Sequence, residues 1–328
     1  MDRHRLLGVA LVVVSACAFG SGGLFAAPVY AAGVGWIVLL SWRFLVGGAI
    51  AWAWLLLSRE RRAALRAISR RELTVTAALG LLYVGNSATY FGALETVPVS
   101  LAALIIYIYP AVVAVLSIRF ARRLPGRRPW IALGVALLGI VLALGGIPAT
   151  EMPPVGGLIL IVASPLIYAV WIILAARFSG ERNASEASAA GEGSSAEAGA
   201  AAAIAMPVMM ISTTVFFWTL ALTTRQPVLP AEIPAAAWPG LLGVAVVSTA
   251  LAILTFYAGA RRIGAAQASL VSTIEPVWTI ALAGILLGQT LTPVQLVGGV
   301  LVIAGVVIAQ TAPPGEGPQV LEARLADE

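Results

Sequence analysis

Two ionisable residues stand inside long apolar segments of this chain, at positions where a charge could do chemistry. Glu275 directly precedes Pro276, and Arg43 lies in an earlier apolar segment. A charge at the centre of a bilayer costs about 2.5–3.5 kcal/mol, so such residues face a cavity or a partner. Glu275 could bind a substrate ammonium, carry a proton, or bond backbone groups freed by Pro276. Arg43 could pair with Glu275 or with helix-end carbonyls, or it could bind a substrate carboxylate.

Polar and aromatic residues follow these charges at helical spacing. Thr76, Tyr83, Asn86 and Tyr90 share one helical face, and Ser164 shares another with two aromatic residues. Unpaired hydroxyls are costly in hydrocarbon, so the stripes predict either interhelical hydrogen bonds or a polar cavity with an aromatic wall. We expect the cavity, with these binding residues: Arg43, Tyr83, Asn86, Tyr90, Tyr107, Ser164, Tyr168, Trp171, Ser272 and Glu275.

Prolines and glycines mark expected bends in the same segments. Pro110, Pro165 and Pro276 each remove a helix hydrogen bond and free a carbonyl. The cluster of Gly20, Gly22 and Gly23 allows either close helix packing or a bend that lines a cavity. We expect these six residues to act as hinges or kinks.

The elements that must position these residues are membrane-spanning helices. Hydrophobic residues make up 60% of the 328 residues and charged residues 11%. Apolar stretches of about 20 residues, long enough to cross a bilayer as a helix, recur along the chain. The prediction is an all-α polytopic membrane protein with ten spans, near 6–28, 35–57, 73–94, 98–119, 130–147, 155–176, 204–223, 238–259, 266–287 and 294–311.

A weak internal repeat at an offset of 166 residues organises these spans. It aligns Tyr90 with Phe256 and Pro110 with Pro276. An odd number of spans per repeat inverts the second repeat in the membrane. We expect a first five-helix repeat within 1–178, a flexible cytoplasmic linker at 179–203, the second repeat in reduced form at 204–311 and a cytoplasmic tail at 312–328. The sixth span, at 155–176, would begin the inverted half.

The distribution of arginine predicts the orientation. All 20 basic residues are arginine, and 18 of them fall on one side if the spans alternate. This positive-inside pattern places both termini in the cytoplasm. The net charge of +5 therefore reflects topology, and we expect no nucleic-acid partner.

The remaining chemistry-bearing residues argue against an enzyme. The single histidine is His4, the aspartates are Asp2 and Asp327, and the single cysteine is Cys17. No catalytic dyad, metal site or serine–histidine pair can be assembled within the spans. We expect no catalytic residues, no metal and no cofactor.

The chain resembles the EamA family of the drug/metabolite transporter superfamily over residues 6–311. The matching segments are Ala18–Ser21, Arg43–Leu45, Ile274–Val277 and Leu286–Gln289, followed by Gly299 and Gly305. Gln289 replaces the usual glutamate of the family, and Arg122–Arg123 replace a similar acid.

This resemblance implies an inner-membrane exporter of small metabolites that works by alternating access at a midplane cavity. The aromatic wall is similar to that of the aromatic amino-acid exporters, which implies neutral and aromatic amino acids as substrates. A passive facilitator or channel, and a multidrug or nucleoside-type exporter, are the alternatives. The expected partners are the small-molecule substrate and membrane lipid, with a monomer as the working expectation.

Overall fold

A computed structural model describes residues 3–120, 127–147, 149–178 and 194–310, and within them the chain is helical without strands. The first half contains α1 (Arg3–Gly20), α2 (Gly22–Ala31), α3 (Trp36–Leu56), α4 (Arg59–Ala67), α5 (Arg70–Ala93), α6 (Val99–Ile106), α7 (Tyr109–Phe120) and α8 (Arg127–Gly145). The second half contains α9 (Val155–Phe178), α11 (Ser194–Thr223), α12 (Trp238–Leu242), a π-helix (Gly243–Leu251), α13 (Ala252–Ile263), α14 (Ala265–Val271), α15 (Ile274–Leu287) and α16 (Pro293–Gln310). Short 3-10 turns lie at Ala149–Glu151, Pro230–Glu232 and Ala235–Ala237.

Helices occupy every range in which a span was expected, and most are apolar enough to cross a bilayer. Within the described residues, 8 helical stretches have the length and hydropathy of a membrane span, and Pro129–Gly145 in α8 is a shorter apolar helix. α5 is 24 residues long but carries polar residues along its length. The chain is therefore an all-helical, multi-pass membrane protein.

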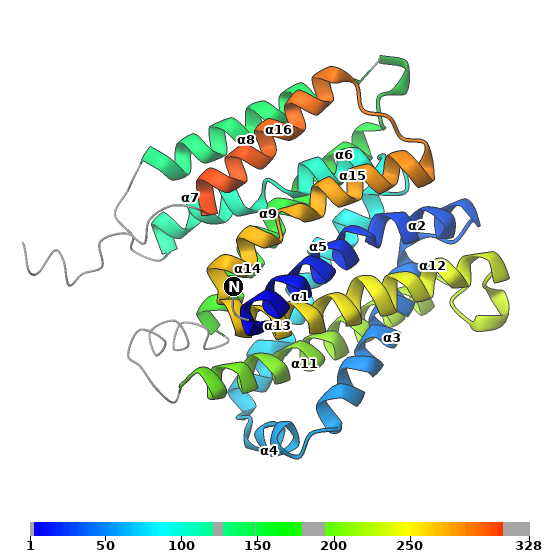
Figure 1. Ribbon diagram of the computed structural model, residues 1–328. Coiled ribbons are helices and arrows are strands. Elements are labelled where there is room, and N and C mark those ends of the chain that lie inside the picture. Colours follow the sequence, from blue (N-terminus) through cyan, green and yellow to red (C-terminus); the bar gives the residue numbers. More distant parts are fainter. Residues whose placement is uncertain (1–2, 121–126, 148, 179–193, 311–328) are drawn as a thin grey trace, which may run out of the picture.

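The helices form one bundle in which distant parts of the chain lie side by side (Figure 1). α8 packs along α16, and α3 packs along α11. α1 packs on α13, and α5 packs on α9. The α8–α16 contact is close because Gly139 and Gly298 face each other, and a Cβ on either would lie within about 3 Å of the opposite backbone.

Two helical stretches are interrupted at matching positions. α6 ends at Ile106 and α7 begins at Tyr109, and α14 ends at Val271 and α15 begins at Ile274. Pro110 and Pro276 therefore lie in the first turn of the helix that follows each break, where the missing N–H is tolerated. The expected interruptions at these two prolines are present.

One local expectation is wrong and one stays a prediction. α9 runs from Val155 to Phe178 through Pro165 as one helix, so Pro165 does not interrupt this span, and its role as a kink stays a prediction. α11 begins at Ser194, so 194–203 are helical instead of linker. This stretch is rich in alanine, the strongest helix former, which explains the extension. The rest of the expected linker, 179–193, and the tail at 312–328 lie outside the described residues.

Candidate functional site

Glu275 lies in the first turn of α15, directly after the break, and is half-buried. Because Pro276 has no N–H, the carbonyl of Ser272 loses its usual helical donor. The Tyr107 hydroxyl donates to this carbonyl at 2.8 Å, and the Glu275 N–H donates to it at 3.0 Å. Tyr107 thus stabilises the break in the second half from the break in the first.

The same hydroxyl also bonds the Glu275 side chain, with 3.0 Å between Tyr107 Oη and Glu275 Oε2. A tyrosine hydroxyl has one proton and can also accept. Its single proton can serve only one acceptor at a time, so the Ser272 carbonyl and the Glu275 carboxylate share one donor, the Tyr107 hydroxyl.

Arg43 lies on α3 and is 7% exposed. Its Nε donates to Thr249 Oγ1 at 2.9 Å, and the guanidinium lies 4.7 Å from the Phe91 ring centroid and 5.1 Å from that of Phe44. These ring contacts place the cation on aromatic faces, an arrangement that suits arginine. Within the described residues no ion pair joins Arg43 to Glu275, so the first of the three alternatives for Arg43 is not seen.

The π-helix positions the acceptor for Arg43. Thr249 Oγ1 donates to the carbonyl of Val244 at 2.9 Å, five residues back, while it accepts from Arg43. Gly47 lets α3 approach this segment, because a Cβ there would lie 3.2 Å from the Ala245 carbonyl. π-helical segments are frequent at functional sites, and this one orients a buried charge.

An aromatic wall extends between the two charges. Ring centroids are 5.1 Å apart for Tyr83 and Trp171, 5.8 Å for Tyr168 and Trp171, and 4.8 Å for Tyr109 and Tyr168. Tyr109 continues the wall to Tyr107 at 5.9 Å. Four of the expected residues, Tyr83, Tyr107, Tyr168 and Trp171, are therefore part of one cluster, together with Tyr109.

Tyr90 is an expected residue that interacts with both charges. It interacts electrostatically with both Glu275 and Arg43. Its ring centroid is 5.2 Å from that of Phe91, on which Arg43 lies. Tyr90 is therefore close enough to both charges to interact with each of them.

Asn86, Ser164 and Ser272 have local partners. Ser164 Oγ donates to Asn86 Oδ1 at 2.9 Å, and both residues are buried between α5 and α9. Ser272 Oγ donates to the carbonyl of Ala268, in its own helix, at 2.9 Å. All three polar groups therefore bond protein atoms. The bond between Asn86 and Ser164 joins two helices, which is the interhelical alternative predicted for the polar stripes.

The glycine cluster brings the first span against this region. Ser21 joins α1 to α2 with the helical hydrogen bonds maintained on both sides. Thr279 Oγ1 donates to the Gly20 carbonyl at 2.9 Å, and a Cβ on Gly20 would lie 3.0 Å from the Glu275 carbonyl. A Cβ on Gly23 would meet the Val99 side chain, and one on Gly22 would lie 3.5 Å from Ser248. At Gly20 and Gly23, close packing is the visible role.

Sequence reasoning missed Thr249, Phe91, Phe44 and Tyr109 as neighbours of the charges. Phe44 follows Arg43 directly, and Tyr109 aligns with Glu275 in the repeat, so these two had a signal in the sequence. The π-helix has no sequence pattern that would have placed Thr249 against Arg43.

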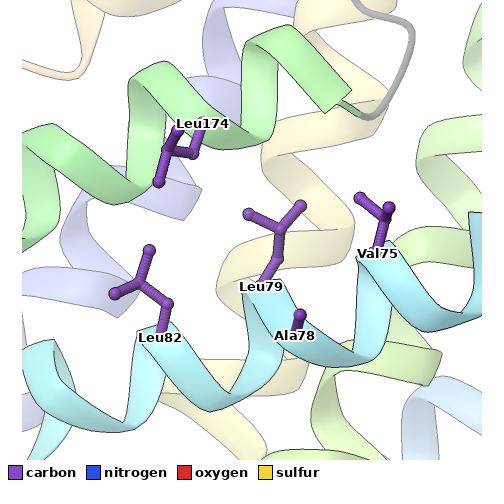
Figure 2. Close-up of a pocket in the computed structure, with 5 residues that line it drawn as sticks. All are labelled: Val75, Ala78, Leu79, Leu82 and Leu174. Atoms are coloured by element: carbon purple, nitrogen blue, oxygen red, sulfur yellow. The ribbon is translucent and has the colours of Figure 1, made fainter.

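An apolar pocket of about 240 Å³ lies between α5 and α9, lined by Val75, Ala78, Leu79, Leu82 and Leu174 (Figure 2). None of the expected binding residues lines it. Trp171 lies next to it and donates from Nε1 to the Leu79 carbonyl at 2.9 Å. Within the described residues, no group of three His, Cys, Asp or Glu side chains is placed to hold a metal ion.

Comparison with known proteins gives one family. The model of the EamA-like transporter family matches residues 6–145 and 194–311. An uncharacterized transporter of Archaeoglobus fulgidus is 26% identical over 247 residues, covering 75% of this chain and 79% of the relative. The uncharacterized transporter YyaM of Bacillus subtilis is 24% identical over 274 residues, covering 82% of each chain. A crystal structure with 18% identity superposes with a TM-score of 0.60 over 97% of this chain and 98% of its own, which shows a shared fold.

Proposed function

The chain belongs to the EamA-like transporter family, and from that premise we propose that it exports neutral and aromatic amino acids by alternating access. The observation that carries the substrate class is a pair of opposite charges: Arg43 lies over the Phe91 ring, which contacts Tyr90, and Glu275 bonds Tyr107 of the aromatic wall. A zwitterion presents a carboxylate and an ammonium, which match a guanidinium and a carboxylate. The tyrosine wall adds flat apolar surface for an aromatic side chain.

The mechanism we propose is rocking of two inverted five-helix repeats about the broken helices. In the proposed repeats, α9 is the counterpart of α1 and α13 is the counterpart of α5. The contact between α1 and α13 therefore corresponds to the contact between α9 and α5. Exchanging the two repeats maps α3–α11 and α8–α16 onto themselves, and it maps the α6/α7 break onto the α14/α15 break. Paired broken helices at corresponding positions are typical of transporters with a midplane site.

The membrane arrangement follows from the same proposal. Ten spans are obtained if α5 and α8 cross the bilayer with the eight longer apolar stretches. The polar residues Thr76, Asn86 and Ser87 of α5 are buried inside the bundle, so lipid need not solvate them. Both termini then lie in the cytoplasm of the inner membrane, because the arginine-rich connections lie on their side.

Counter-flow in proteoliposomes tests transport. Vesicles loaded with unlabelled phenylalanine should accumulate labelled phenylalanine transiently and with saturation. Flux without saturation or counter-flow would instead identify a passive facilitator or channel. Competition by nucleosides or cationic drugs, without competition by amino acids, would identify the other exporter class.

Analogues test the assignment of the charges. Phenethylamine lacks the carboxylate and 3-phenylpropionate lacks the ammonium. We expect Arg43→Gln to weaken phenylalanine binding about tenfold or more, the value of a charge-assisted hydrogen bond, and to leave phenethylamine binding unchanged. If Arg43→Gln weakened the binding of phenylalanine and phenethylamine equally, Arg43 would not bind the substrate carboxylate.

Whether Glu275 couples export to proton entry is tested by Glu275→Gln. If protons move through Glu275, the variant should lose the pH dependence of uptake. An unchanged pH profile would reject proton coupling through this residue and leave it as an ammonium-binding or backbone-bonding group.

A further inference from the structure

The apolar pocket between α5 and α9 is separate from the charges and the tyrosine wall. Four of its five lining residues come from α5 and the fifth, Leu174, comes from α9 (Figure 2). Ala78 is exposed, and Val75, Leu82 and Leu174 are half-exposed, so the pocket opens at the surface of the bundle. Its volume is about 240 Å³ and its walls are aliphatic. Within a bilayer, the molecules that contact this surface are lipids.

One arginine lies on the same face of α5 as the pocket. Arg71 precedes Val75 by four residues and Ala78 by seven, spacings that bring residues onto one face of a helix. It therefore lies one turn beyond the pocket, toward the start of α5, and it is exposed. Arg70 is also exposed but lies about 100° further round the helix.

The neighbouring helix α4 marks the depth of Arg71 in the membrane. α4 lies at one end of the bundle (Figure 1). It carries several arginines and also has an apolar side that packs on the bundle. Leu65 of α4 packs against the buried cluster of Leu55 and Val208, as do Trp52 and Trp54 of α3, and the Arg61 guanidinium lies 3.7 Å from the Trp54 ring centroid. Tryptophans at the end of a span, next to a short arginine-rich helix, are typical of the membrane–water interface. Arg71, four residues after α4 ends, is therefore at headgroup level.

We propose that this place is a binding site for an anionic phospholipid, with one acyl chain in the pocket and the phosphate on Arg71. Arginines are dense over residues 59–71, which gives this end of the bundle a positive charge complementary to anionic headgroups. Lipid tails are as apolar as leucine, so the hydrophobic effect does not favour the pocket over the bilayer. Selectivity therefore comes from dispersion contacts with the aliphatic walls and from the charge at the mouth.

The test measures lipid bound to the purified full chain by native mass spectrometry. The probes are palmitoyl-oleoyl phosphatidylglycerol and phosphatidylcholine with the same chains, added separately to the detergent-solubilised protein. We expect wild type to retain phosphatidylglycerol preferentially. Arg71→Gln should weaken this binding about fivefold, the effect of one arginine near an anionic headgroup, and should leave phosphatidylcholine binding unchanged. Arg70→Gln is the matched control and should have a smaller effect.

The chain-binding half of the site has its own variant pair. Ala78→Phe places a ring in the pocket and should weaken phosphatidylglycerol binding, while Leu81→Phe, on an exposed position outside the lining, should not. Glycerol phosphate, which has no chains, should not compete. Equal effects of Arg71→Gln and Arg70→Gln would indicate general surface attraction, and equal effects of the two phenylalanine variants would exclude the pocket. Either result overturns the proposal.

Discussion

The hydroxyl of Tyr107 should stabilise the fold because it joins the two helix breaks. Tyr107→Phe keeps the ring, which is 4% exposed, and removes the bonds to the Ser272 carbonyl and to Glu275. The carbonyl keeps the Glu275 N–H as a donor at 3.0 Å, but the carboxyl group loses its bond to Tyr107. Interhelical hydrogen bonds in membranes average about 0.6 kcal/mol, and a buried polar group left unpaired costs about 1–3 kcal/mol. We therefore expect the free energy of unfolding to fall by about 1–3 kcal/mol.

Tyr109→Phe is the matched control. Its ring packs against Tyr107 and Tyr168, and no hydrogen bond of its hydroxyl is seen within the described residues. This variant should stay within about 0.5 kcal/mol of wild type. Cys17 is the single cysteine of the chain and lies partly buried on α1, so its reaction with a thiol-reactive dye can report unfolding in detergent.

Comparison of the two variants decides the argument. If Tyr107→Phe and Tyr109→Phe are equally stable, the hydroxyl bond across the breaks contributes nothing measurable. If both are equally destabilised, loss of a tyrosine hydroxyl from the aromatic wall in general is the cause. Either outcome refutes a specific stabilisation of the second break by Tyr107.

Three further predictions concern the neighbours of this centre. Thr249→Val keeps the side-chain shape but removes the acceptor for Arg43, and it should weaken phenylalanine binding at least tenfold in a competition assay, with Thr255→Val on α13 as the control. Gly20→Leu should abolish counter-flow while the protein still reaches the membrane, because a side chain there meets the backbone of α15; normal transport would show that the approach is not needed. Gln289→Ala removes the side-chain acceptor that caps the start of α6. The free energy of unfolding should fall by about 0.5–2 kcal/mol and the melting temperature with it, whereas an unchanged melting temperature would mean that the cap adds nothing.

The spans could be predicted because hydrocarbon imposes a simple rule on sequence. A helix must be apolar over about 20 residues to cross it, so the helix ends lie within a few residues of the expected ranges, except for the start of α11. The breaks near Pro110 and Pro276 were predictable for a similar reason, since proline removes a local donor whatever surrounds it. Pro165 shows the limit of this rule, because α9 continues through it.

The site could be predicted only in part, because contacts between helices depend on packing. Arg43 and Glu275 were found from the cost of burying charge, but their partners come from other helices. Asn86 was expected to face a cavity, and its amide instead accepts from Ser164 across the helix contact. Spacing along one helix places residues on a face but does not say which neighbour that face meets.

The two breaks are alike in backbone and unlike in chemistry, and under the function we propose this difference assigns substrate binding to the second break. Tyr109 occupies the position in the first half that Glu275 occupies in the second, each directly before a proline. The bond between the breaks runs one way, from the Tyr107 hydroxyl to the Ser272 carbonyl freed by Pro276. A molecule that displaced the Glu275 side chain from Tyr107 would therefore act at the second break, while the Tyr107 hydroxyl still donated to the Ser272 carbonyl. In a rocking mechanism, binding at Glu275 and movement of α15 against α6 and α7 are then coupled through one hydroxyl group.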